Sequence, residues 1–74
     1  MADIAKVITI IGSSPQGFAE AAAVAVEQAS QTVRGITGAD VVSMSATVQD
    51  GRITEYKTTV NLAFGVERGG SAGE

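Results

Sequence analysis

The chain has 74 residues, a formal net charge of −3, and no His, Cys or Trp. Without His and Cys it can build neither a zinc site of the usual kind, nor a cysteine nucleophile, nor a Ser-His-Asp relay, nor a disulfide. Only 5 residues are Lys or Arg, against 8 Asp or Glu. We therefore expect no nucleic-acid partner, because binding to phosphates needs clustered basic side chains.

The composition also indicates a core that is thin in volume. Hydrophobic residues make up 45% of the chain, but 12 of them are Ala and only three are aromatic. A domain of this size buries about 60–65% of its unfolded surface. Disulfides and thiolate-held metals are absent, which leaves oligomerisation as the main way to add buried surface. We expect one domain that associates with further copies of itself.

No apolar stretch of the chain reaches the roughly 18 residues that a membrane-spanning helix requires. The apolar run near the N-terminus is interrupted by Lys6 and lacks the features of a secretory signal. We therefore expect a cytoplasmic location and no membrane partner.

The first half of the chain predicts a strand followed by a helix. Residues 4–11 are rich in β-branched side chains and predict the strand. Ser14 is placed to cap a helix whose first residue is Pro15, and Gly35 is a natural residue to end it. The helix is therefore predicted over 15–34. Its apolar face has helical spacing and consists of Phe18, Ala22, Ala25, Val26, Ala29 and Val33.

The second half predicts a long hairpin. Residues 38–49 and 53–66 both alternate between apolar and polar side chains, as strands with one buried face do. A two-residue turn at Asp50-Gly51 would place apolar residues of one strand opposite polar residues of the other. The alternation therefore favours a three-residue loop over 49–51 with a bulge, in which Met44 lies opposite Tyr56 and Val42 lies opposite Thr58.

The resulting order is β-α-β-β. The fold class is α+β, with a three-stranded antiparallel sheet curled around one helix. The single domain is expected to span 1–67, and residues 68–74 lack any pattern and are expected to form a flexible C-terminal tail.

Few residues suggest chemistry by themselves. Asp40 and Glu55 carry oxygen ligands suited to a hard cation such as calcium, provided that a symmetric oligomer brings several copies together. Lys57, on the polar face of the last strand, could contact an anion or act as a base. No pair of carboxylates has a spacing typical of acid–base catalysis, so we do not expect an enzyme.

The layout resembles the dodecin family. The resemblance covers residues 6–67 and is most specific in three segments. They are the strand-to-helix junction KVITIIGSSPQGF, the helix end ASQTVRGI, and EYKTTVNLAF in the last strand. Dodecins are hollow homododecamers that bind and sequester flavins without catalysis. The resemblance therefore implies a dodecameric shell that stores or sequesters a small ligand, with riboflavin or FMN as the expected one.

The residues that match the family's flavin site differ here. The family's flavin-stacking Trp corresponds to Gly38, its flavin-bonding Gln corresponds to Lys57, and a basic residue of many bacterial members corresponds to Ser45. Loss of the indole removes about 1–3 kcal/mol of stacking, and Lys57 offers donors but no acceptor. We expect a degraded flavin site, in which Tyr56 could partly replace the lost aromatic ring. The alternative is an ion-binding or purely structural dodecamer, with Asp40 and Glu55 at the symmetry axes.

Overall fold

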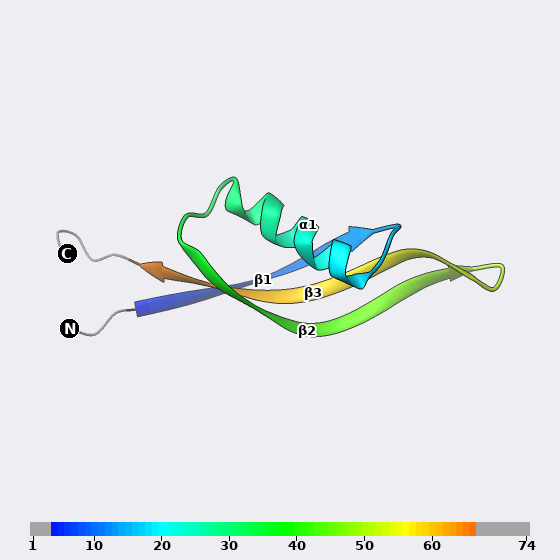
Figure 1. Ribbon diagram of the computed structural model, residues 1–74. Helices are drawn as coiled ribbons and strands as arrows, with labels where there is room; N and C mark the ends of the chain where they lie inside the picture. Colours follow the sequence, from blue (N-terminus) through cyan, green and yellow to red (C-terminus); the bar gives the residue numbers. More distant parts are fainter. Residues whose placement is uncertain (1–3, 67–74) are drawn as a thin grey trace.

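The computed structural model describes residues 4–66, and within them the predicted order of elements is confirmed. One helix and three strands follow each other as β1, α1, β2 and β3 (Figure 1). The sheet is antiparallel, with the last strand in the middle of the order β1-β3-β2. The bounds are Ile4–Ser14 for β1, Phe18–Ser30 for α1, Ile36–Gln49 for β2 and Arg52–Val66 for β3.

The helix packs on one face of the sheet and covers β1 and β3 far more than β2 (Figure 1). Three alanines of α1 are buried, Ala21, Ala25 and Ala29. Ala25 and Ala29 form the core cluster with Val60 and Leu62, the two large apolar side chains that are fully enclosed. Close approach of the two layers depends on Gly12, where a Cβ atom would overlap the carbonyl oxygen of Ala21. We call this side of the sheet the covered face; it includes Ile8, Ile10, Thr58, Val60 and Leu62.

The helix is shorter than predicted at both ends. Residue 14 is not its N-cap, because β1 continues to Ser14, which pairs with Tyr56. The Ser14 hydroxyl accepts a hydrogen bond of 3.0 Å from the backbone N–H of Gln16, and Gly17 precedes the first helical residue. At the other end the helix stops at Ser30. Gly35 does adopt a left-handed backbone with φ of 78°, but it does so directly before β2 rather than at the helix end.

The predicted three-residue loop of the hairpin is wrong. Asp50 and Gly51 both have positive φ, 53° and 75°, as the central residues of a two-residue type I′ turn do. The shift of register comes instead from a bulge between Thr47 and Val48, where β3 has one residue more than β2. Beyond it Met44 pairs with Thr58 and Ala46 with Tyr56. The predicted pairs Met44–Tyr56 and Val42–Thr58 are therefore wrong, although Met44 still shares a face with Tyr56 and Thr58. The assignment of the apolar residues of both strands to one face was correct. A bulge in β3, rather than a longer loop, aligns the two apolar faces.

The chain is more extended than a compact domain of its length. Its radius of gyration is 15.5 Å, whereas a compact domain of this length has about 11 Å. The β2–β3 hairpin extends beyond the N-terminal end of α1 (Figure 1). Four exposed apolar residues of the hairpin lie on the same face of the sheet as α1 but are not covered by it. We call them the hairpin stripe: Val41, Met44, Val48 and Ile53.

No helix in the described part of the chain is long and apolar enough to cross a membrane. The predicted tail at 68–74 lies outside the described residues.

Candidate ligand site on the open face of the sheet

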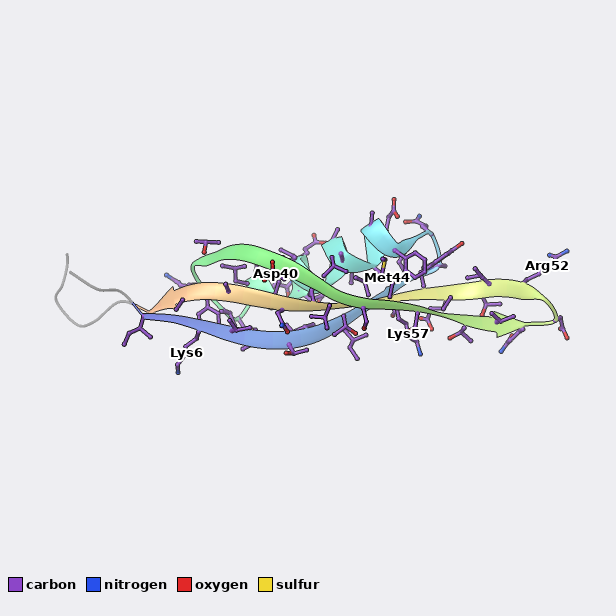
Figure 2. All side chains as sticks on the ribbon, turned by 90° about the horizontal axis from the view of Figure 1, so that it is seen from below. Lys6, Asp40, Met44, Arg52 and Lys57 are labelled. Carbon is purple, nitrogen blue, oxygen red and sulfur yellow. The ribbon has the colours of Figure 1, made fainter. Side chains whose placement is uncertain are left out.

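The face of the sheet turned away from α1 carries the predicted site residues. Strand residues alternate between faces, so the neighbours of Thr58, Val60 and Leu62 along β3 point away from the helix. We call this side the open face, and Figure 2 views the molecule from that direction. It includes Thr9, Ser13, Gly38, Asp40, Ser45, Glu55, Lys57 and Asn61.

The register arranges these residues in rows across the three strands. One row consists of Ser13, Lys57 and Ser45, since Lys57 pairs with Ser13 on one side and with Ser45 on the other. Side chains directly opposite each other in an antiparallel pair have Cβ atoms about 4.5–5.5 Å apart. Two of the predicted site residues, Ser45 and Lys57, are therefore neighbours. The partner on β1, Ser13, was not among them.

A second row consists of Thr9, Asn61 and Asp40. The Thr9 hydroxyl donates a hydrogen bond of 2.7 Å to Oδ1 of Asn61, so one amide oxygen of this row is already engaged. The row contains a single carboxylate. Among residues 4–66 no group of three or more carboxylate side chains is close enough to hold a metal ion.

A third row consists of Val7, Ala63 and Gly38. A Cβ atom added at Gly38 would meet only the Cβ of Ala63, at 4.0 Å. Gly38 does not have a positive φ either. Neither space nor backbone geometry within the chain requires a glycine at this position, so a larger side chain fits there.

The predicted site residues do not all come together within one chain. Gly38 lies in the row of Ala63, six residues along β3 from Lys57. Six residues of a strand span about 20 Å. The same spacing separates Glu55 from Asn61, the partner of Asp40. Asp40 and Lys57 also lie well apart in Figure 2. One chain can thus supply one half of such a site, either the Lys57 end or the Gly38 end.

Tyr56 is not available to this surface of its own chain. It lies on the covered face, where its ring meets that of Phe18 edge to face with centroids 4.9 Å apart. Tyr56 can therefore not stack on a ligand bound to the open face of its own chain, and a role for it at an interface between copies stays a prediction.

Sequence reasoning missed the contributions of β1. Ser13 and Thr9 join the site only through their register with β3. The alternation of polar and apolar residues indicated that Asn61 and Lys57 share a face. Which residues of β1 stand beside them depends on a pairing between strands more than 40 positions apart in sequence.

Comparisons with known proteins agree with this architecture. The Dodecin family model matches residues 4–67. The solved dodecin of Streptomyces davaonensis is 26% identical, with a TM-score of 0.87 over 92% of this chain and 100% of that chain. The dodecin of Streptomyces coelicolor is 29% identical, with a TM-score of 0.86 over 89% and 94%.

A calcium-chelating antigen is also similar. This calcium dodecin from Mycobacterium tuberculosis, described as having a novel calcium-binding site, is 33% identical, with a TM-score of 0.76 over 93% of this chain and 99% of that chain. No curated protein matches the sequence.

Proposed function

Since the chain belongs to the dodecin family, we propose that it forms a homododecameric shell in the cytoplasm that binds, stores or sequesters a small ligand without catalysis. The observation that carries this proposal is the separation of Gly38 and Lys57 by about 20 Å along one face of the sheet. A flavin ring system is shorter than that span. A ligand that meets both positions therefore needs two copies of the chain.

The exposed apolar surface supports assembly. Among residues 4–66, nine large hydrophobic side chains are at least 36% exposed, whereas only two, Val60 and Leu62, are buried. Apolar side chains that gather on the surface of a folded protein, as those of the hairpin stripe do, mark an interaction site. The hairpin stripe and the exposed Val7 and Ile11 of the open face are suited to contacts between copies.

Flavin is the proposed ligand class by family, with affinity reduced by two positions. Gly38 has no aromatic surface for stacking, which contributes roughly 1–3 kcal/mol per stacked ring. Lys57 cannot accept a hydrogen bond from the flavin edge. Since each 1.4 kcal/mol is tenfold in affinity, the two changes together weaken binding by about two orders of magnitude or more.

Quenching of flavin fluorescence tests this proposal. Riboflavin is titrated into refolded, ligand-free wild type and into the double variant Gly38→Trp, Lys57→Gln. We expect weak quenching by wild type and saturation by the variant at concentrations about a hundredfold lower. Gly38→Ala, which adds no aromatic ring, is the matched control. Tight binding by wild type contradicts the degraded site, and no binding by either protein removes flavin as the ligand.

An ion-binding or purely structural dodecamer is the alternative. It is favoured by the similarity to a calcium-chelating dodecin and by Asp40 and Glu55 on the open face. Because these carboxylates lie in rows about 20 Å apart, each would bind calcium only together with its counterparts in other copies. Melting in calcium and in EDTA tests this. A rise of the melting temperature with calcium that Asp40→Asn abolishes supports the ion site, and Glu27→Gln on the helix is the control.

A further inference from the structure

We propose that the Asp50-Gly51 peptide at the tip of the β2–β3 hairpin is a site of spontaneous covalent modification, at which Asp50 isomerises to isoaspartate. The inference rests on the sequence and the geometry of the turn, and it goes beyond the proposed function.

The sequence sets Asp50 apart from the other aspartates. The chain has three, and they precede Ile4, Val41 and Gly51. Isomerisation begins when the backbone nitrogen of the next residue attacks the side-chain carboxyl carbon, and a β-branched side chain on that residue crowds the nitrogen. Glycine has no side chain and leaves its nitrogen open to attack. Asp50 is therefore the aspartate whose following residue opposes the reaction least.

The turn leaves both reacting groups unengaged. The ladder of β2 and β3 ends at the pair of Gln49 and Arg52, so the two residues of the turn lie outside it. Both residues of the turn are exposed. Within residues 4–66, neither the backbone hydrogen bonds of turns and loops nor the side-chain hydrogen bonds involve Asp50 or Gly51. The Gly51 nitrogen can thus approach the Asp50 carboxyl group without breaking a hydrogen bond of the fold.

The backbone of the turn is compatible with the cyclic intermediate. This intermediate is a five-membered succinimide ring, which holds ψ of Asp50 near the value of about −120° that the first central residue of a type II′ turn has. Type I′ and type II′ turns share a positive φ at this residue, which is 53° here. They differ in the orientation of the peptide between the two central residues, and Gly51 accepts either orientation. Since both turns occur in two-residue hairpins, rotation of one peptide unit reaches the reactive geometry while the strands stay paired.

The reaction needs no reagent other than water. The Gly51 nitrogen forms a bond to Cγ of the protonated Asp50 carboxyl group, and the carboxyl hydroxyl leaves as water with the proton from the nitrogen. Water then adds to the main-chain carbonyl carbon of the ring, and the bond from that carbon to the nitrogen breaks. The chain now runs through Cβ and Cγ of Asp50 and is one atom longer, with a free α-carboxylate beside it. The mass of the protein is unchanged.

Asp40 provides an internal reference for the rate. It is also exposed, but it lies within β2 and pairs with Asn61. Attack at this position requires local opening of the strand, which has a free-energy cost that exposed turns do not have. We therefore expect isoaspartate to form at least about tenfold faster at position 50 than at position 40.

Incubation of the folded, full-length protein at neutral pH tests the inference. Samples taken over several weeks are digested, and electron-transfer fragmentation distinguishes isoaspartate from aspartate at each position. A parallel sample unfolded in urea gives the rates without the turn. We expect the folded protein to react at position 50 within about tenfold of the unfolded rate, and position 40 to react measurably only in urea. Asp50→Glu, which would have to form a six-membered ring, is the control and should give no isomer at this position.

The outcomes that overturn the inference are distinct. If isoaspartate forms at position 50 in urea but not in the folded protein, the turn protects this peptide. If positions 40 and 50 react equally in the folded protein, the turn has no special reactivity. Labelling with an isoaspartyl O-methyltransferase, which methylates the free α-carboxylate, is the second measurement. We expect label on aged wild type and not on aged Asp50→Glu, and equal labelling of the two proteins would likewise overturn the inference.

Discussion

The two faces of this small sheet differ in how much of their apolar surface the chain itself buries. On the covered face, α1 closes over β1 and β3, and Val60 and Leu62 are fully buried against its alanines. On the open face and along the hairpin stripe, apolar residues such as Ile11 and Val48 are 64% and 60% exposed. The chain itself therefore covers the first region, whereas it leaves the second exposed, and under the proposed function other copies cover it.

The two faces also differ in how much room they leave for side chains. Packing on the covered face depends on small residues at contact points, and Gly12 has no room for a side chain. The open face has no such restriction, because a Cβ at Gly38 would meet only one neighbour, at 4.0 Å. A side chain at position 38 is thus expected to cost the folded chain little.

The largest expected effect is that of Gly12→Ala. The new methyl group overlaps the carbonyl oxygen of Ala21 and also comes within 2.9 Å of the Ala25 Cβ, so α1 must move off the sheet. We expect destabilisation by about 3 kcal/mol or more, measured by urea unfolding at fixed protein concentration. Gly38→Ala on the open face is the control, with a change within about 0.5 kcal/mol. Equal losses for the two variants would remove the distinction between the faces.

Substitutions in the hairpin stripe should act on assembly instead. Met44→Asp and Val48→Asp place charges on exposed apolar positions that are not part of the core of the chain. We expect smaller species in sedimentation velocity with helix and strand content retained in circular dichroism, since a desolvated unpaired charge disfavours the interface. Thr54→Asp, on the neighbouring bulge, is the control. Unchanged sedimentation of both stripe variants would show that this surface does not hold copies together.

A moderate effect is expected at Thr58, which is 1% exposed and whose hydroxyl donates a hydrogen bond of 2.9 Å to the carbonyl of Phe18. Thr58→Val keeps the shape and removes this bond between β3 and the start of α1. The expected loss is about 1 kcal/mol, read from urea unfolding. Thr59→Val, on the opposite face of the same strand, should cost less, and the reverse order would contradict the assignment of the faces.

Effects no larger than that at Thr58 are expected in the hairpin turn. Gly51 has φ of 75°, and a Cβ there would meet no other atom, so only the backbone opposes a side chain. Gly51→Ala should cost about 1 kcal/mol. Asp50→Asn should leave stability unchanged or raise it slightly, because Asn-Gly is the preferred type I′ pair. A melting temperature that rises in Gly51→Ala would contradict this turn geometry.

Local sequence patterns predicted the order and type of the elements. The bounds of the helix and the geometry of the turn depend on pairing between strands that are far apart in sequence. The apolar spacing of the helix and the alternation of β3 were sufficient for the β-α-β-β order and for the polar face that carries Lys57. The helix start was misplaced because the pairing of Ser14 with Tyr56 keeps this residue in β1, which overrides its preference for an N-cap. The turn was misassigned because a bulge at Thr47/Val48 brings the apolar residues to one face as a longer loop would, but with the pairs shifted by two residues.

The candidate site was predictable only in part for the same reason. Positions 38, 45 and 57 came from the resemblance, but the direct pairing of Ser45 with Lys57 and the span of about 20 Å to Gly38 follow from register. Ser13 has no signal in the sequence that links it to Lys57, since 43 positions separate the two and only the β1–β3 ladder joins them.

The mass of the assembly in solution tests the central claim most directly, because the account requires other copies both to cover the hairpin stripe and to complete the ligand site. Native mass spectrometry of ligand-free wild type at micromolar concentration, with sedimentation equilibrium as a second measurement, gives the number of chains. The account predicts a homododecamer. A folded monomer under the same conditions would contradict it, since the exposed apolar surface and the divided site would then belong to a complete protein.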